Sequence, residues 1–181
     1  MRLLFVGPPG AGKGTQAERV AARLGIAHVS TGEMFRALDE TSDLGRRVRA
    51  IMAAGEYVSD EIVIEMLEDR IGQPDAEAGY ILDGFPRTTA QAEALDEHLG
   101  SNGLDGVVLL EAPETELVER MLGRGRSDDT EATILNRLHV YAEQTAPLLE
   151  MYGARGLVRP VDGVGSLDEI TERILRVLGS E

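Results

Sequence analysis

Residues 7–15 read Gly-Pro-Pro-Gly-Ala-Gly-Lys-Gly-Thr. An apolar run at 3–6 precedes this stretch, and a helical pattern at 16–24 follows it. Glycines at such a strand-to-helix turn let successive backbone N–H groups point inward as an anion nest, and the positive end of the helix dipole reinforces it. Lys13 can reach an anion held there as a point charge. The stretch therefore predicts a phosphate-binding loop.

The loop departs from the phosphate-loop pattern at one position. Gly14 stands where the pattern has Ser or Thr, and Thr15 comes one residue later. This weakens the case for direct magnesium ligation by a loop hydroxyl, but not the case for phosphate binding. A glycine-rich turn without a ligand is the alternative, and the flanking elements argue against it. In addition, Lys13 is the only lysine among the 18 basic residues.

The composition narrows the class of protein. A chain of 181 residues is long enough for one core of good size. A net charge of −14 argues against nucleic acid or an anionic membrane as the main partner. The chain has no cysteine, its three histidines lack ligand spacing, and no apolar run approaches the length of a membrane span. Without a signal-peptide pattern, the expected compartment is the cytoplasm.

Apolar runs and helical periodicity alternate along the chain. Strands are predicted at 2–6, 26–29, 80–82, 106–110 and 157–161. Helices are predicted at 13–24, 32–39, 43–54, 60–72, 88–99, 114–122, 131–152 and 167–178, with a bend near Pro147 in the seventh. This alternation predicts an α/β fold with a five-stranded, mostly parallel, doubly wound sheet flanked by helices. Ligands should bind beyond the carboxyl ends of its strands.

Residues 30–58 lack strand-like runs and predict a small helical insertion in the α/β core.

Several polar residues are candidates for helix N-caps or for ligand contacts. Ser30-x-x-Glu33 has the pattern of a capping box, and Asp60 is another candidate N-cap. Thr88-x-x-Gln91 is either a further capping box or part of a ligand site, and the residues alone leave both interpretations open.

Asp83 ends the predicted strand at 80–82, and Gly-Phe-Pro-Arg follows at 84–87. A carboxylate at a strand end near a phosphate loop can hold a magnesium ion, usually through water. A turn or helix cap is the alternative for Asp83. Arg87 is a candidate phosphate-binding fork, with a surface ion pair as its alternative.

Arginines gather in the second half of the chain. Arg120 and Arg124 lie four residues apart on a predicted helix, where like charges repel, although Glu116 can offset Arg120. Arg124, Arg126 and Arg137 form a cluster that an anion between them would explain.

This set of residues fits phosphoryl transfer, in which a protein supplies positioning and positive donors. We find no general base aimed at a hydroxyl and no histidine–carboxylate pair in the sequence pattern. A phosphate nucleophile needs no base. The residues therefore favour transfer to a nucleoside monophosphate over hydrolysis or sugar phosphorylation.

With these motifs the sequence resembles the adenylate kinase family along its whole length. The family motifs are the loop at 7–15, Ser-Thr-Gly-Glu-x-x-Arg at 30–36, Asp-Gly-Phe-Pro-Arg at 83–87 with Gln91, and Gly-Arg-Gly-Arg with Asp-Asp at 123–129, followed by Asn136-Arg137 and Tyr141. The resemblance implies a P-loop NTPase-type fold and the reaction ATP + AMP ⇌ 2 ADP with Mg²⁺. It also implies a monomer that serves adenine nucleotide homeostasis.

The resemblance further implies a role for each matching residue. The ATP-binding set would be Gly10, Ala11, Gly12, Lys13, Gly14, Thr15, Arg120, Arg124 and Gly165. The AMP-binding set would be Thr31, Arg36, Glu56, Tyr57, Val58, Gly84, Phe85, Pro86, Arg87, Gln91, Arg126 and Arg137. The catalytic set would be Lys13, Arg87, Arg120, Arg124, Arg126 and Arg137. Gln91 would read the adenine edge of AMP, Asp83 would hold Mg²⁺ through water, and the Phe85–Pro86 bond would be cis.

The family also implies a division of the chain. The core would comprise 1–29, 59–122 and 132–181, with an NMP-binding region at 30–58 and a lid at 123–131. Many bacterial members carry a lid of several tens of residues, some with zinc, between the positions of Arg124 and Arg126. Here only Gly125 separates them, so this is a short-lid form in which structural zinc is not expected. The region at 30–58 and the lid would both move on closure.

Two alternative functions are considered. A UMP/CMP kinase of the same fold is the first, although Thr31 and Gln91 favour adenine. A nucleotide-binding regulatory module is the second, although binding of ATP alone does not require a second set of phosphate-binding arginines.

Overall fold

The structure is a computed structural model that describes residues 1–100, 103–125 and 129–179. Within these residues five strands form one sheet in the order β2-β3-β1-β4-β5, and every pairing between neighbours is parallel. The strands are β1 (Arg2–Val6), β2 (Ala27–Ser30), β3 (Tyr80–Asp83), β4 (Gly106–Glu111) and β5 (Val158–Asp162). The predicted α/β fold is confirmed, with strand boundaries shifted by about one residue at most positions.

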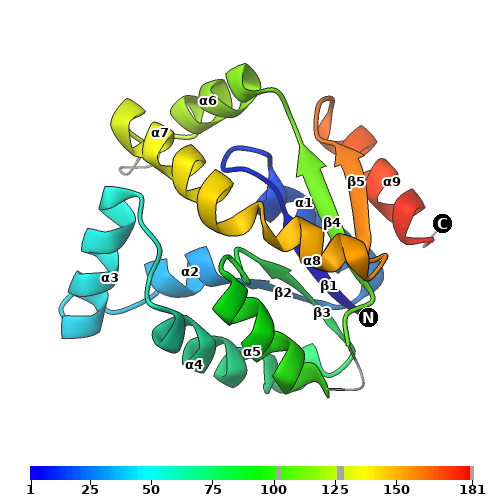
Figure 1. The fold of residues 1–181 in the computed structure, drawn as a ribbon, viewed down its shortest axis with the longest axis horizontal. Helices are drawn as coiled ribbons and strands as arrows, with labels where there is room; N and C mark the ends of the chain where they lie inside the picture. The colour runs from blue at the N-terminus through cyan, green and yellow to red at the C-terminus, as the bar shows by residue number, and fades with distance from the viewer. Residues whose placement is uncertain (101–102, 126–128, 180–181) are drawn as a thin grey trace.

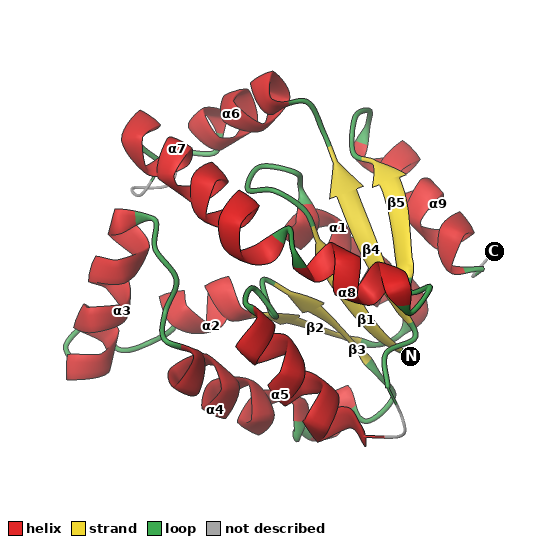
Figure 2. Cartoon of the chain, viewed as in Figure 1, coloured by secondary structure: helices red, strands yellow, loops and turns green. Residues whose placement is uncertain are grey.

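Helices cover both faces of the sheet (Figures 1 and 2). They are α1 (Lys13–Leu24), α2 (Thr31–Arg36), α3 (Asp43–Ala54), α4 (Asp60–Ile71), α5 (Thr89–Leu99), α6 (Glu114–Gly123), α7 (Glu131–Val140), α8 (Leu148–Ala154) and α9 (Leu167–Leu178). A 3₁₀ turn, η1 (Pro74–Ala76), precedes β3, and a π-helical turn, η3 (Tyr141–Thr145), joins α7 to the start of α8.

The alternation of side chains along each strand divides the core into two layers. Leu4 and Val6 of β1 face one layer, which α4, α5 and α8 complete with Leu67, Leu95 and Tyr152. The intervening Leu3 and Phe5 face the other layer, which includes residues of α1, α6 and α9. Both faces of the sheet are buried, as is usual for a parallel sheet. Because all five strands are parallel, the loops that follow them leave from the same edge of the sheet.

Two predicted caps are wrong in detail, because long-range partners compete with the local pattern. Ser30 is the N-cap residue of α2, but its hydroxyl donates to Asp83 Oδ2 at 3.3 Å and accepts no hydrogen bond from a helix N–H group within the described residues. Ser59, not Asp60, precedes α4, and the Asp60 carboxylate accepts hydrogen bonds from Thr88 and Gln91. In contrast, Thr88 caps α5, which is one of the two interpretations left open from the sequence, with its Oγ1 accepting from Gln91 N–H at 3.2 Å.

The long helix predicted at 131–152 is interrupted. The π-helical turn at 141–145 separates α7 from Pro147, which precedes α8. A π-turn and a proline are the usual causes of such a break, so the predicted bend is confirmed but begins earlier than Pro147. No helix within the described residues is long and apolar enough to cross a membrane.

Candidate active site

A cleft of about 790 Å³ lies beyond the carboxyl ends of β1 and β3. The phosphate loop and the segments around 31–36, 52–58 and 83–91 form its walls. The arginines of α6 and α7 and the segment around Gly165 complete its lining. The volume is that of a ligand-binding site, and the position is the one expected for a doubly wound sheet.

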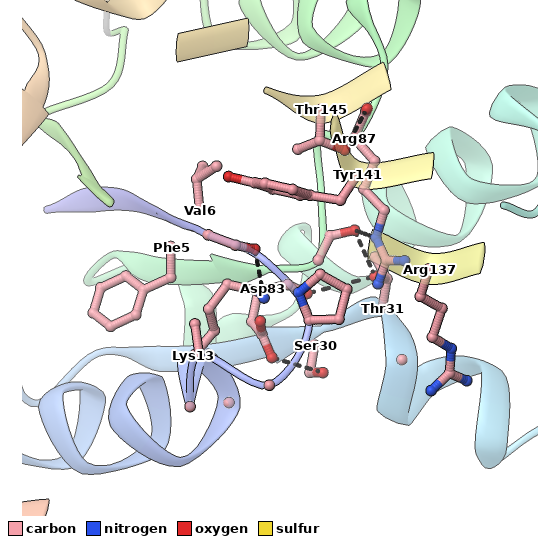
Figure 3. Close-up of a pocket in the computed structure, with 18 of the residues that line it drawn as sticks. Phe5, Val6, Lys13, Ser30, Thr31, Asp83, Arg87, Arg137, Tyr141 and Thr145 are labelled. Carbon is pink, nitrogen blue, oxygen red and sulfur yellow. Dashed lines mark hydrogen bonds between the residues drawn. The ribbon is translucent and has the colours of Figure 1, made fainter. Parts of the chain in front are cut away.

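The phosphate loop shapes the floor of this cleft. Lys13 Nζ donates to the carbonyls of Gly7 at 2.8 Å and Pro8 at 3.0 Å, so the lysine folds back over its own loop (Figure 3). Within the described chain, α1 begins with neither a capping side chain nor an acidic residue in its first turn. Its positive dipole end points at the cleft, where the Asp83 carboxylate beside Gly14 is the nearby protein anion.

The surroundings of Lys13 lower the pKa of its ammonium group. Burial, with smaller contributions from the charges of Arg87 and Arg124, lowers the pKa of its ammonium group to about 8 against the opposing effect of Asp83. The negative charge of Asp83 is too small to offset the cost of burying the Lys13 ammonium group. An anion bound in the cleft would supply further negative charge and stabilise the ammonium form.

Asp83 lies at the end of β3, beside Lys13 and Ser30 (Figure 3). Burial alone would raise the pKa of its carboxyl. The neighbouring His28, 3.8 Å away, and the charges of Lys13 and Arg87 outweigh burial and hold this pKa below its ordinary value. Asp83 is thus a carboxylate at neutral pH, with oxygens of the kind that Mg²⁺ prefers.

Gly14 and Asp83 fit together closely. A Cβ atom added at Gly14 would lie 3.2 Å from Asp83 Oδ2, tighter than an ordinary contact. A side chain at Gly14, such as the Ser or Thr of the usual pattern, would crowd this carboxylate. At Gly14, where the usual pattern has Ser or Thr, the Asp83 carboxylate therefore lies in the space that the hydroxyl-bearing side chain would take. The local residues fit a magnesium ion held by Asp83 through water.

The arginine cluster contains an anion of the protein itself. Asp129 accepts from Arg124 through both carboxylate oxygens, at 2.5 and 2.7 Å, and from Arg137 Nη1 at 3.0 Å. The Asp129 side chain is 1% exposed and that of Arg124 is 30% exposed, so the carboxylate end of these ion pairs is buried. Arg120 pairs with Glu116 at 2.8 Å and also donates to the Gly163 carbonyl. Three arginines are thereby held in fixed geometry at the cleft wall.

On the wall formed by the segment around 83–91, Arg87 is anchored at several points. Its Nε donates to the Gly84 carbonyl at 2.7 Å, and its guanidinium lies 4.9 Å from the ring centre of Tyr57. Its own carbonyl accepts from Thr145, whose hydroxyl is also bonded to the Tyr57 hydroxyl at 2.9 Å. Such anchoring leaves the outer guanidinium N–H groups available to a bidentate anion.

Gly84 allows this wall to be compact. Its φ of +82° belongs to the left-handed region, and an added Cβ would lie 2.8 Å from both Thr31 Oγ1 and Arg87 Nη2. Thr31 donates to the Gly84 carbonyl at 3.0 Å. The Phe85–Pro86 bond that follows is cis, as expected from the family motif.

The end of helix α3 lies close to α7 (Figure 1). Its last carbonyls, at Ala53 and Ala54, accept from Thr133 at 3.3 Å and from Asn136 at 2.8 Å. Arg137 Nη2 lies 3.5 Å from the Met52 carbonyl. These contacts close the segment around 52–58 onto the helix that carries Arg137.

The structure brings most of the predicted site residues to this single cleft. Its lining includes every residue of the predicted ATP-binding and AMP-binding sets except Phe85 and Arg126. The Phe85 side chain is 3% exposed and belongs to the core, so only its backbone is placed to take part. Arg126 lies outside the described residues.

Three residues of this site were not assigned a site role from the sequence. Asp129 belongs to a family motif but had no stated role, and Asp60 was expected only to cap a helix. Thr145 has no local sequence signal, because it reaches Arg87 only through the π-helical turn. In the sequence, Asp60 and Asp129 cannot be distinguished from an ordinary helix cap or a surface charge.

Comparison with known proteins agrees with this geometry. The family model described as adenylate kinase matches residues 5–157. The chain is 50% identical to an adenylate kinase of Nocardia farcinica over 99% of each chain, and 51% identical to one of Kocuria rhizophila over 98% of each. It is 48% identical to an adenylate kinase of Mycobacterium bovis over 99% of each chain.

The chain belongs to the adenylate kinase family. It is therefore a nucleoside monophosphate kinase, a transferase that moves a phosphoryl group between ATP and AMP. The earlier preference for phosphoryl transfer over hydrolysis is confirmed by this membership, and so is the predicted P-loop fold.

Proposed function

We propose that the phosphoryl group passes between two phosphate sites that face each other across the cleft. The donor site comprises the phosphate loop with Lys13, together with Arg120 and Arg124, and it binds ATP. The acceptor site comprises Thr31, Arg36 and Arg87, and it binds AMP. The observation that carries this proposal is that both sets line one cleft, together with Arg137 of α7.

Each group has a task that follows from its surroundings. The loop amides and the α1 dipole hold the outer phosphates of ATP. Lys13 gains its full charge when those phosphates enter. Arg87, anchored by Gly84 and Tyr57, presents a fork to the AMP phosphate. Arg124 and Arg137, aligned by Asp129, neutralise charge that develops on the transferring group. Arg126 is proposed to share this task.

The proposal includes Mg²⁺ bound with ATP and held by Asp83 through water. When bound, the ion neutralises charge on the ATP phosphates and orients them. Ser30 and His28 keep the Asp83 carboxylate in place beside the loop. No residue is needed as general base, because the attacking AMP phosphate is already an anion.

The base of AMP is proposed to lie near Gln91, among Phe35, Val58 and Val63. These apolar side chains are buried, and they line the cleft at this end. Glu56, Tyr57 and Val58 would contribute backbone contacts, as would Gly84, Phe85 and Pro86. Gly165, beyond β5 on the far side of the phosphate loop, would meet the adenine of ATP.

Two segments are proposed to close over the nucleotides: the NMP-binding region at 30–58 and the short lid at 123–131. The hydrogen bonds from Thr133 and Asn136 to the end of α3 support the first, because they hold that region against the core. We further propose that the protein acts as a monomer, since one chain lines both phosphate sites. A cytoplasmic location is part of the proposal and is consistent with a chain free of cysteine.

Steady-state phosphorylation of AMP, CMP, UMP and GMP with MgATP as donor tests this function. We expect the highest kcat/KM for AMP. A preference for CMP or UMP would overturn the assignment of the acceptor base. A complex with a bisubstrate analogue that spans both nucleotides would show directly which arginines contact which phosphates.

A further inference from the structure

The Gln91 side-chain amide is held at both ends, although it lines the cleft. Its Nε2 donates to Asp60 Oδ1 at 2.7 Å, and its Oε1 accepts from Arg87 N–H at 2.8 Å. Gln91 is 1% exposed, so water does not readily replace either partner. The amide is thus set by two groups from different parts of the chain.

These two partners permit only one orientation of the amide. A carboxylate accepts hydrogen bonds and a backbone N–H group donates one. If the amide turned over, its oxygen would face the Asp60 carboxylate and its NH₂ group would face the Arg87 N–H. Both hydrogen bonds would be replaced by repulsion between like partial charges, and buried groups would lose their partners.

The fixed orientation leaves a defined pair of groups for a ligand. One of the two Nε2 hydrogens and one of the two Oε1 lone pairs are used by the protein. Neither group makes a further hydrogen bond within the described residues, so the second hydrogen and the second lone pair are left for a ligand. Adenine offers the complement on its Watson–Crick edge, with N1 as acceptor and the 6-amino group as donor. Hypoxanthine and guanine carry N1–H and a 6-oxo group there, which is the reverse order.

We propose that Asp60 is a specificity-determining positioning residue, which selects a 6-amino purine over a 6-oxo purine by fixing the orientation of Gln91. The inference rests on the proposed function, in which the base of AMP meets Gln91. Asp60 does not touch the nucleotide in this account. It acts through Gln91, with the Arg87 N–H group as the second determinant.

Asp60 also has a purely structural contact that must be separated from this role. Its carboxylate accepts from Thr88 Oγ1 at 3.1 and 3.2 Å, which ties the start of α4 to the start of α5. Thr88 additionally caps α5 through Gln91 N–H. Replacing Thr88 by Val removes the tie and the cap but leaves the Asp60–Gln91 hydrogen bond in place, so this variant is a matched control.

The test compares AMP with inosine monophosphate, which has a 6-oxo group and N1–H but is otherwise the same nucleotide. Dissociation constants are measured by calorimetry, and kcat/KM by steady-state kinetics with MgATP, for the full chain. In Asp60→Asn the new amide can face Gln91 with either an acceptor or a donor, so the turned-over orientation is no longer repelled on that side. We expect the preference for AMP over inosine monophosphate to fall by about tenfold or more.

Asp60→Ala, which removes the acceptor altogether, should lower the same preference and serves as a second variant. Thr88→Val should lower the melting temperature and leave the preference unchanged. An unchanged preference in the folded Asp60 variants, or an equal loss in Thr88→Val, would overturn the inference. If the wild-type protein failed to phosphorylate AMP, the proposed function itself would fail, and that result is distinct from any change in preference.

Discussion

Gly14 provides the room that the carboxylate of Asp83 occupies, since a Cβ atom at Gly14 would come within 3.2 Å of Asp83 Oδ2. The two residues lie 69 positions apart in the chain and meet because α1 begins beside the carboxyl end of β3. The glycine that departs from the usual phosphate-loop pattern is thus explained by a neighbour that the local sequence does not reveal.

Replacing Gly14 by Ala should separate activity from stability. Alanine favours the helix by roughly 0.5–1 kcal/mol, so we expect no loss of melting temperature. The displaced Asp83 should hold Mg²⁺ less well, and kcat at limiting Mg²⁺ should fall by about tenfold. Activity measured across a magnesium titration checks this. In Gly153→Ala, where an added Cβ meets nothing within 4 Å, activity should be unchanged. Equal magnesium dependence in both variants would contradict the role given to Asp83.

Replacing Arg137 by Ala should lower kcat by about 10³-fold or more, because the cation that neutralises the transferring group is lost. Circular dichroism and the melting temperature should show that the fold survives. Arg46→Ala is the matched control, since Arg46 is exposed on α3 and bonds only to nearby groups at Thr41 and Asp43 among the described residues. Near-normal turnover in Arg137→Ala would show that the transfer site is assigned wrongly.

The fold could be predicted because its signals are local. The strands are short apolar runs, and the glycines Gly25 and Gly55 end helices where the sequence places them. Helix α9 even has the capping box of Ser166 and Glu169 that its sequence allows. The same kind of pattern failed at Ser30, because the nearby Asp83 carboxylate takes the hydroxyl that would have capped α2. Local rules cannot include a partner 53 residues away.

The residues of the candidate site could be predicted from the sequence, but the hydrogen bonds and ion pairs that join them could not. The arginine cluster predicted a bound anion as ligand, and the structure shows a carboxylate of the protein itself, that of Asp129, paired with Arg124 and Arg137. Asp60 resembled a cap because it stands at the start of a helix, yet its partners lie on α5 and at that helix's N-cap. Thr145 could not be found at all, because its approach to Arg87 depends on a π-helical turn that has no clear sequence signal.

Removing the hydroxyl of Tyr152 should stabilise the protein. This side chain is fully buried, and its hydroxyl has no hydrogen-bond partner within the described residues. Since burial of an unpaired hydroxyl costs about 1–3 kcal/mol, Tyr152→Phe should raise the free energy of unfolding by about 1 kcal/mol. Denaturant unfolding monitored by circular dichroism measures the change.

Thr171→Val is the opposite case and serves as the comparison. The Thr171 hydroxyl is also buried, but its hydrogen has two acceptors within reach, Gln16 Oε1 at 2.7 Å and the Leu167 carbonyl at 2.8 Å, and its oxygen accepts from Arg19 Nε at 3.0 Å. Its loss leaves Gln16 without that partner and should lower the free energy of unfolding by about 1–3 kcal/mol. Destabilisation by both substitutions would show that the Tyr152 hydroxyl is paired in solution.

Binding of ATP should take up protons in the mildly alkaline range because of Lys13. With a pKa of about 8, half of the nucleotide-free molecules carry a neutral Lys13 at that pH. Bound phosphates favour the ammonium form and raise this pKa, so binding must add a proton to the neutral fraction. The affinity for ATP should accordingly fall as the pH rises through 8, while below about pH 7 it should not depend on Lys13.

Calorimetry of MgATP binding in two buffers of different ionisation enthalpy measures this proton uptake at pH 8 and again at about pH 7. Lys13→Arg is the control, since a guanidinium remains charged throughout this range and takes up no proton. We expect uptake at the higher pH in the wild-type protein, little at the lower pH, and none from this position in the variant. Equal uptake in the two proteins would mean that another group titrates and that Lys13 is already charged in the empty cleft.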